Sequence, residues 1–337
     1  MYTQSPLLFE APLAHEVGVY TGYCNCRECR SNSTQAFAPG WAEREWEAGV
    51  GPNPQVKTPL PPSRQQPLPP LTTPALSTRT KWMRSKPPGT PIYVNIPLGS
   101  EEPGTTPMTG IFLPDGYRTQ QKVDILLYLH GHKIAPNQPN NSWSVDWYWQ
   151  NGRIGAFREE LNNSNKNVVL VMPTLSRRSN PGWLGSPGGL DRYLDMVMAA
   201  LSTSGPYRGK NATVGNIILA GHSGAGKYMR ELPLSNPQYS SHIRECWCFD
   251  CMYNSCDAVL WSLWARQNPG NTRLYNYYIS NAKTRSNTIA ESKNLQRENL
   301  PNVFTVPLNP PDQSFHHWIP ITYWRTHIER TPFLLNR

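Results

Sequence analysis

The stretch that decides the fold reads Asn216-Ile217-Ile218-Leu219-Ala220-Gly221-His222-Ser223-Gly224-Ala225-Gly226. It begins with consecutive apolar residues, which are typical of a strand buried on both faces of a parallel sheet. Small residues then surround a single serine, and the segment 227–232 can continue as a helix. The pattern predicts a strand, a sharp turn and a helix, with Ser223 in a strained backbone conformation at the turn.

Two motifs compete for this stretch. The first is the nucleophile elbow, G-x-S-x-G, which presents a serine on a strand-to-helix turn. Ala225 replaces its last glycine, and we interpret this as a variant because alanine is still small. The second is the phosphate-binding loop, G-x-x-x-x-G-K-[ST], which Gly221, Gly226 and Lys227 fit. Tyr228 does not fit it, because a small hydroxyl is needed there to hold magnesium, so the elbow is favoured over this loop and over purely structural glycines.

Composition and charge limit the classes of partner. The 337 residues include 32 basic and 23 acidic ones, a net charge of +9, but the basic residues are scattered. We therefore expect a solvated basic surface and no nucleic-acid partner. No run of about 20 apolar residues occurs, so no membrane span is expected. Residues 1–10 lack the basic and apolar segments of a secretory signal, so no such signal is expected. The cellular location and the oligomeric state both stay open.

The seven cysteines form two groups, Cys24, Cys26 and Cys29 near the start, and Cys246, Cys248, Cys251 and Cys256 far downstream. The first group is compatible with zinc, with disulfides or with free thiols, and lacks the paired spacing that would identify a metal site. Cys246 and Cys248 alternate along a predicted strand, so packing explains them without any chemistry.

The chain divides near residue 80. Residues 50–78 contain nine prolines, which favour an extended polyproline conformation over a folded unit. We therefore predict an irregular, cysteine-containing and proline-rich arm over residues 1–80. The catalytic domain is predicted over residues 81–337.

Strands alternate with helices in the predicted domain. Apolar runs predict strands at 91–97, 108–114, 123–129, 168–172, 244–250, 274–279 and 303–306, in addition to the one before Ser223. Helical patterns lie at 154–161, 190–201, 258–266, 286–298 and 319–328. The first two strands are expected to pair antiparallel. The pattern predicts an α/β fold with a mostly parallel central sheet of about eight strands and helices on both faces.

Three features occur in a characteristic order: His130-Gly131 after the third strand, the serine turn after the fifth, and histidines after the last. With these features in this order, the chain resembles the α/β-hydrolase fold superfamily over about residues 90–335. Within that superfamily it resembles the single-domain serine esterases. The resemblance implies a serine hydrolase that cleaves a small-molecule or polymeric carboxylic ester through an acyl-enzyme. It implies no cofactor and no metal.

The resemblance also implies a base in the loop after the last strand, where His316 and His317 are adjacent. The His-x-x-x-Pro spacing to Pro320 is common in relatives and selects His316, with His317 as the alternative. The chemistry needs this base because a serine hydroxyl is a weak nucleophile until its proton is removed. His222, beside Ser223 on the tight turn, is interpreted as packing.

The base also needs a carboxylate to orient it. Most relatives place this acid after the strand at 274–279, but residues 280–288 contain no Asp or Glu. Asp250, at the end of the preceding strand, is the chosen acid because it keeps the order Ser, Asp, His. Asp257 and Asp312 are the alternatives, and capping of the next element is the structural interpretation of Asp250.

An oxyanion needs preorganised N–H donors. The resemblance implies the N–H of Gly224 and a second donor from the turn that contains Gly131, where His132 or Lys133 is expected. His130 and His132 also form half of a possible zinc site, but no third ligand is apparent nearby.

Tryptophans cluster in the sequence near the expected cleft, and they predict either a substrate wall or ordinary packing of a helix on the sheet. They are Trp143, Trp147, Trp149 and Trp318, with Trp183 as a further member. Two other functions stay open: a peptidase or amidase on the same scaffold, and a non-catalytic binding protein with the same turn.

Overall fold

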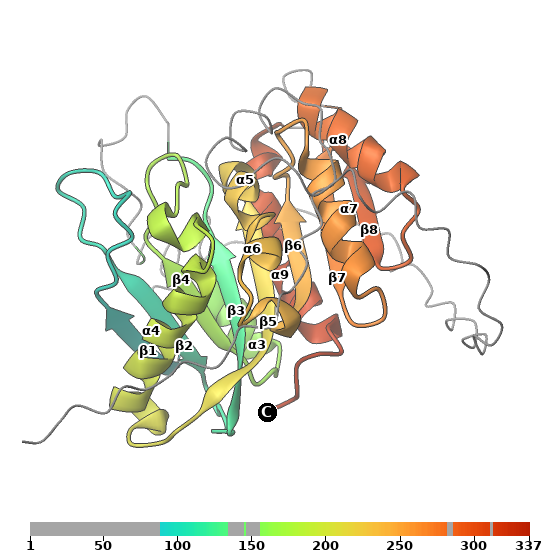
Figure 1. Ribbon diagram of the computed structural model, residues 1–337. Coiled ribbons are helices and arrows are strands. Elements are labelled where there is room, and N and C mark those ends of the chain that lie inside the picture. Colours follow the sequence, from blue (N-terminus) through green and yellow to red (C-terminus); the bar gives the residue numbers. More distant parts are fainter. Residues whose placement is uncertain (1–87, 134–144, 146–155, 282–285, 311–312) are drawn as a thin grey trace, which may run out of the picture.

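The computed structural model describes residues 88–133, 145, 156–281, 286–310 and 313–337. Within these ranges the strands form one eight-stranded sheet in the order β1-β2-β4-β3-β5-β6-β7-β8 (Figure 1). The strands are β1 Gly89–Val94, β2 Thr109–Pro114, β3 Lys122–Leu129, β4 Val169–Pro173, β5 Thr213–His222, β6 Ile243–Phe249, β7 Arg273–Ile279 and β8 Val303–Leu308. Figure 1 shows β1 and β2 at one side of this sheet and β7 and β8 at the other.

Strand direction follows the prediction from the sequence. β1 pairs antiparallel with β2, and β2 pairs antiparallel with β4. All other neighbours, from β4 through β8, are parallel. Because β4 lies between β2 and β3, the chain goes back across the sheet from β3 to β4. It then passes β3 to reach β5. The predicted α/β fold with a mostly parallel central sheet of about eight strands is confirmed.

Helices cover both faces of the sheet. They are α3 Phe157–Asn163, α4 Gly189–Thr203, α5 Gly226–Met229, α6 Leu232–Ser235, α7 Asp257–Gln267, α8 Ser286–Arg297 and α9 Ile319–Arg330. α4, α7 and α8 contribute to one buried apolar cluster, and α3 and α9 contribute to the other. The predicted helices agree with these bounds within a few residues; the start of the one expected at 154–161 lies outside the described residues.

Alternation along each central strand builds the two cores. On β5, Leu219 belongs to the cluster under α4 and α7, and Ile218 belongs to the cluster under α9. On β6, Cys246 belongs to the cluster under α4 and α7, and Trp247 belongs to the cluster under α9. Successive side chains of a strand point to opposite faces, so an uninterrupted apolar run is what a strand covered on both sides requires.

The helix after Ser223 is shorter than the sequence suggests. α5 ends at Met229 and a separate turn, α6, begins at Leu232. Pro233 explains the break, because its nitrogen has no hydrogen to donate to the Met229 carbonyl and its ring would clash with that carbonyl.

The predicted boundary between the arm and the domain, near residue 80, lies outside the described residues. In the ranges that are described, no helix combines the length and the apolar character needed to cross a bilayer.

Candidate active site

Ser223 lies at the sharp turn that follows β5. It has a φ of 54°, in the left-handed region, and opens the short 3₁₀ helix η5 Ser223–Ala225. This conformation costs a residue with a side chain roughly 1–2 kcal/mol, so packing has to hold it in place. Ser223 is partly exposed, whereas the second half of β5 is buried. The turn therefore brings one hydroxyl from a buried strand to the surface.

Close packing around this turn explains its small residues. A side chain on Gly131 would come within 3.0 Å of the Ser223 Cβ, and one on Gly226 would overlap the carbonyl oxygen of Cys251. Ala225 is fully buried without such a conflict. Of positions 225 and 226, it is therefore Gly226 that excludes a side chain, which explains why alanine is accepted one residue earlier.

Gly226→Ala is expected to lower the free energy of unfolding by about 3 kcal/mol, the upper end of the usual cost of overpacking. The added methyl group meets a backbone carbonyl, which cannot move aside as a flexible side chain can. Urea unfolding measures the change. Gly270→Ala is the control, since nothing lies within 4 Å of its added Cβ. Equal unfolding midpoints for the two variants would contradict the packing argument.

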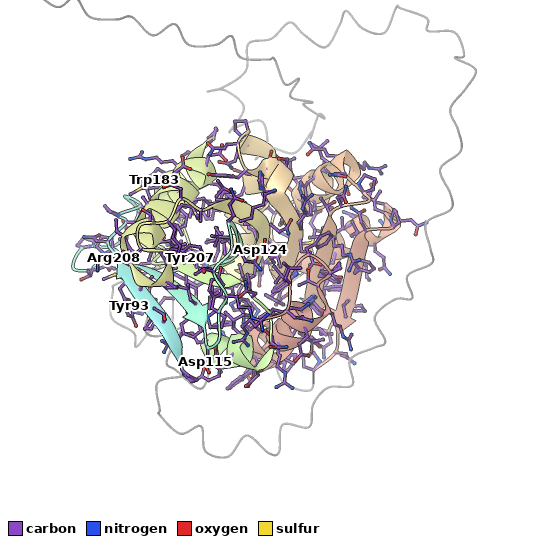
Figure 2. The ribbon with its side chains drawn as sticks, turned by 90° about the horizontal axis from the view of Figure 1, so that it is seen from below. Tyr93, Asp115, Asp124, Trp183, Tyr207 and Arg208 are labelled. Carbon is purple, nitrogen blue, oxygen red and sulfur yellow. A yellow bond between two sulfur atoms is a disulfide. The ribbon has the colours of Figure 1, made fainter. Side chains whose placement is uncertain are left out.

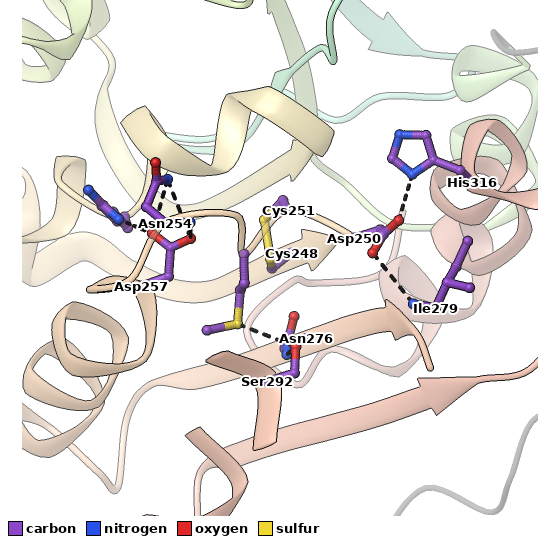
Figure 3. Close-up of a disulfide and its surroundings, with 11 residues drawn as sticks. Cys248, Asp250, Cys251, Asn254, Asp257, Asn276, Ile279, Ser292 and His316 are labelled. Atoms are coloured by element: carbon purple, nitrogen blue, oxygen red, sulfur yellow. Dashed lines mark hydrogen bonds and ion pairs between the residues drawn. A yellow bond between two sulfur atoms is a disulfide. The ribbon is translucent and has the colours of Figure 1, made fainter. Parts of the chain in front are cut away.

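Asp250 occupies a second strained turn, directly after β6. It is fully buried and has a φ of 49°. Its N–H donates to the Tyr277 carbonyl at 2.7 Å, and its Oδ1 accepts from the Ile279 N–H at 3.4 Å. Its Oδ2 accepts from Nδ1 of His316 at 2.7 Å, as Figure 3 shows. The carboxylate is thus held at the carboxyl ends of β6 and β7 and contacts the imidazole.

His316 reaches this carboxylate from the 3₁₀ helix η7 Gln313–Trp318, between β8 and α9. It is buried, and its ring centroid lies 4.4 Å from that of His222. Since His222 directly precedes Ser223, the His316 ring lies beside the serine turn. His317 is exposed, with its ring 6.5 Å from that of His222. The Asp250 contact is made by His316.

His222 ties the two segments together. Its Nε2 donates to the carbonyl of His316 at 3.0 Å, and the side chain is buried. Burial, followed by the nearby His316 and His317, holds the pKa of His222 well below its usual value. A neutral His222 therefore packs at the turn and fastens the His316 loop to it.

The turn after β3 supplies the Gly131 and His132 that the sequence singles out. A side chain on Gly224 would overlap the His132 ring, so this turn lies against the residue that follows Ser223. Of the two alternatives for the second donor, Lys133 is the less suitable, because its N–H donates to the Arg177 carbonyl at 2.7 Å. The N–H of His132 therefore stays the candidate for the second donor to an oxyanion.

His130 is a structural member of the same turn. Its Nε2 accepts from the Leu175 N–H at 3.1 Å, and its Nδ1 donates to the Gly131 carbonyl at 2.9 Å. Burial lowers the pKa of His130 to about 4, so the ring stays neutral above that pH. Both ring nitrogens serve the backbone, which is not the arrangement of a zinc ligand. Among the described residues, no cluster of His, Cys, Asp and Glu has the makings of a metal site.

The downstream cysteines differ from the prediction. Cys246 is free and buried, as packing alone would explain. Cys248, however, forms a disulfide with Cys251, with Cα atoms 5.5 Å apart, so its interpretation as a packing residue is wrong. The overlooked signal is the C-x-x-C spacing across the end of a strand, where a turn brings the second cysteine back.

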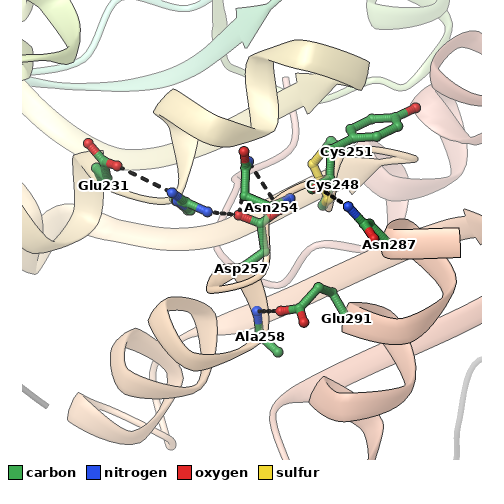
Figure 4. Close-up of polar contacts among 10 residues, drawn as sticks. Glu231, Cys248, Cys251, Asn254, Asp257, Ala258, Asn287 and Glu291 are labelled. Atoms are coloured by element: carbon green, nitrogen blue, oxygen red, sulfur yellow. Dashed lines mark hydrogen bonds and ion pairs between the residues drawn. A yellow bond between two sulfur atoms is a disulfide. The ribbon is translucent and has the colours of Figure 1, made fainter. Parts of the chain in front are cut away.

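Asp257 has a different environment from Asp250. Its carboxylate pairs with Arg230 and accepts from the Asn254 N–H at 2.8 Å (Figure 4). Nearby, Glu291 accepts from the Ala258 N–H at 3.0 Å, which joins α8 to the start of α7. These contacts identify a structural network. Asp312, the other alternative acid, lies outside the described residues.

The predicted substrate wall is only partly described. Trp143, Trp147 and Trp149 lie outside the described residues. Trp318 is partly buried and packs against the cluster under α9. Trp183 donates its indole N–H to the Pro97 carbonyl at 2.8 Å. The two described tryptophans thus have packing or hydrogen-bonding partners of their own.

A hollow of about 400 Å³ lies elsewhere, between the start of β1, the end of β2 and the segment after α4. Figure 2, seen from below, shows Tyr207 and Asp115 in this part of the molecule. Tyr117 and Tyr207 share a hydrogen bond of 2.8 Å there. Because Tyr117 precedes β3 in the chain, this hollow faces the amino ends of the parallel strands and not the Ser223 turn.

No model of a protein family matches the chain, and no curated protein matches its sequence. Among solved structures, it is similar to FphF, a fluorophosphonate-binding serine hydrolase of Staphylococcus aureus, with 14% identity and a TM-score of 0.45 over 72% of this chain and 100% of that one. It is also similar to the S-formylglutathione hydrolase FrmB of the same organism, with 12% identity and a TM-score of 0.46 over 72% and 96%. A feruloyl esterase module from Clostridium thermocellum gives 11% identity and 0.45 over 80% and 92%.

Proposed function

We propose that this chain is a serine hydrolase that cleaves carboxylic esters through an acyl-enzyme, with Ser223, His316 and Asp250 as its triad. The observation that carries the proposal is the 2.7 Å hydrogen bond between Asp250 and His316. It joins two buried side chains from distant segments beside a serine that has a φ of 54°. A strained serine, a buried imidazole and a buried carboxylate in one place match the roles that acyl transfer requires.

The first chemical step is attack by Ser223. Its Oγ forms a bond to the ester carbonyl carbon while Nε2 of His316 takes the hydroxyl proton. Asp250 accepts from Nδ1–H of His316, so the proton of the neutral ring is on Nδ1, Nε2 can act as the base, and the imidazolium that forms is favoured. The tetrahedral intermediate then collapses, and the imidazolium returns its proton to the departing alcohol.

The developing oxyanion needs donors that are in place before the reaction. The first N–H groups of a helix have no intrahelical acceptor, and Gly224 lies in that first turn, within η5. His132, whose ring lies against Gly224, offers the second N–H from the Gly131 turn. Water then attacks the acyl-enzyme, with His316 as base, and releases the acid and free Ser223.

The proposal is tested with a fluorophosphonate probe, which phosphonylates an activated serine and loses fluoride. We expect a single phosphonyl group on the full-length chain, located by tandem mass spectrometry at Ser223, and none after heat denaturation. Folded protein that is not labelled, or that is labelled at another residue, contradicts the proposal and favours a non-catalytic binding protein.

A substrate panel then separates ester cleavage from amide cleavage. Matched p-nitrophenyl esters and p-nitroanilides with the same acyl groups are compared by kcat/KM. We expect turnover of the esters. Cleavage restricted to anilides or peptides would replace the esterase by an amidase or peptidase on the same scaffold.

A further inference from the structure

The Cys248–Cys251 disulfide encloses the candidate acid. Cys248 belongs to β6, Cys251 follows the turn, and Asp250 lies between them, as Figure 3 shows. We infer that this disulfide positions the Asp250 carboxylate for His316, so that Cys248 and Cys251 are positioning residues for the reaction. The inference rests on the function proposed above and names a determinant of rate that lies outside the triad.

The backbone of Asp250 needs support from its surroundings. Its φ of 49° is one that residues with a side chain seldom adopt. Such a conformation persists only when the surroundings over-determine it. Hydrogen bonds to Tyr277 and Ile279 fix Asp250 from the β7 side. The disulfide constrains the chain on both flanks of the same residue, which removes the freedom of the turn to relax toward an ordinary conformation.

The disulfide also lies against the serine turn. Gly226, three residues after Ser223, approaches Cys251 so closely that a Cβ would overlap the Cys251 carbonyl oxygen. On the other flank, Cys248 is paired with Gly221 in the β5–β6 ladder. Both ends of the disulfide thus contact the segment that carries Ser223. The bond therefore fixes the acid turn relative to the serine turn.

So short a bridge contributes little to the stability of the whole fold. A disulfide stabilises mainly by restricting the unfolded chain, and this effect grows with the length of the loop it closes. A sequence separation of three residues is close to the minimum. Both cysteines are also buried, so the bond needs no role in joining distant surfaces. Its main effect is therefore on the local geometry of Asp250.

Breaking the bond frees this turn without removing the carboxylate. A dithiol would transfer two electrons and two protons to the disulfide, giving two thiols and the cyclic disulfide of the reagent. Asp250 could then leave the left-handed conformation, and the contact with Nδ1 of His316 would lengthen or turn. A misplacement of about 1 Å at a catalytic group can lower the rate by about 10²-fold.

The test is the double variant Cys248→Ala/Cys251→Ala in the full chain. We expect kcat for a p-nitrophenyl ester to fall by about 10²-fold, with little change of KM, because the carboxylate orients the base and does not bind substrate. Cys246→Ala is the matched control. It removes a thiol from the same buried cluster, on the same strand and the same face, but no bond, and it should keep the wild-type kcat.

A double-mutant cycle with Asp250→Asn separates positioning from general damage. If the disulfide acts through Asp250, its removal in the Asp250→Asn background should have almost no further effect. We expect kcat to change there by no more than about twofold, which is the usual scatter of such comparisons. A folded double variant with wild-type kcat overturns the inference. So does an equal loss of kcat in both backgrounds, which would indicate an effect unrelated to the carboxylate.

A reduction experiment on the wild-type protein covers the case in which the double variant does not fold. If the double variant does not fold, wild-type protein is reduced with dithiothreitol, and loss of kcat is compared with alkylation of Cys248 and Cys251 mapped by tandem mass spectrometry. Loss that follows alkylation of another cysteine instead, such as the disulfide-bonded Cys256, overturns the inference. Failure of the proposed function is distinct, because wild-type protein would then show neither labelling of Ser223 nor ester turnover.

Discussion

If the proposed triad operates, His316→Gln is expected to lower kcat/KM for ester hydrolysis by about 10⁴-fold or more, comparable to the loss of a triad histidine in known serine hydrolases. Glutamine keeps a polar side chain of similar reach but has no nitrogen that can take and return a proton near neutral pH. The Ser223 hydroxyl would stay protonated during attack. Initial rates with a p-nitrophenyl ester, together with the rate of fluorophosphonate labelling, measure the effect.

His317→Gln is the matched control, because it makes the same chemical change one residue further along. His317 is exposed, whereas His316 is buried and bonded to Asp250. We therefore expect kcat/KM for His317→Gln to stay within about threefold of wild type, as for surface changes in general. If kcat/KM fell for His317→Gln and not for His316→Gln, His317 would be the base. The contact between Asp250 and His316 would then have no role in catalysis.

Asp250→Asn is expected to lower kcat by about 10⁴-fold, the effect of the same change in the best-studied serine triad. An amide keeps the shape of the carboxylate but can donate to Nδ1, which favours the wrong tautomer of His316. It also lacks the charge that stabilises the imidazolium. Circular dichroism and urea unfolding show whether the variant is folded, and single-turnover acylation shows which step is slow.

Asp257→Asn provides the contrast with the alternative acid. Asp257 pairs with Arg230, and both side chains are buried. Breaking such a pair from one side costs about 3–5 kcal/mol of stability, because the remaining charge stays buried. We expect lower stability with nearly unchanged kcat in the folded protein. A loss of kcat for Asp257→Asn, with Asp250→Asn active, would reverse the two assignments.

The position of Asp250 after β6, instead of after β7, has a simple geometric basis. β6 and β7 are parallel neighbours, with Phe249 opposite Tyr277. An acid that follows β6 can therefore lie at the end of β7 without belonging to it. The hydrogen bonds of Asp250 to the Tyr277 carbonyl and the Ile279 N–H place it there. The missing carboxylate at residues 280–288 is thus compatible with a complete site.

Much of the fold could be predicted from the sequence, because it depends on local chemistry. The apolar run before Ser223 identifies a strand covered on both faces, and alternating periods of two and 3.6 residues locate the other elements. Small residues around Ser223 indicate the tight turn. The early end of α5 follows from Pro233 as well, although the prediction extended the helix to residue 232.

The contacts of the candidate site could be predicted only in part. The residues Ser223, Asp250 and His316 were identifiable because each follows a predicted strand. The His-x-x-x-Pro spacing favours His316 over His317 through the family resemblance, but the contact with Asp250 itself depends on the path of η7. The sequence left His132 and Lys133 as alternatives, and only the structure shows that the Lys133 N–H donates to Arg177, 44 residues away in sequence.

The sequence by itself determined the order of elements, the two-sided burial of the sheet and the serine turn, since each depends on residues within about one element of each other. Tertiary structure alone decided that His316 meets Asp250, that Gly226 and not residue 225 has to be glycine, and that Cys248 bonds to Cys251 around the acid. The physical reason is distance along the chain. Such contacts form only where the ends of folded strands converge. The space available to each side chain there is set by packing among segments that are far apart in the sequence.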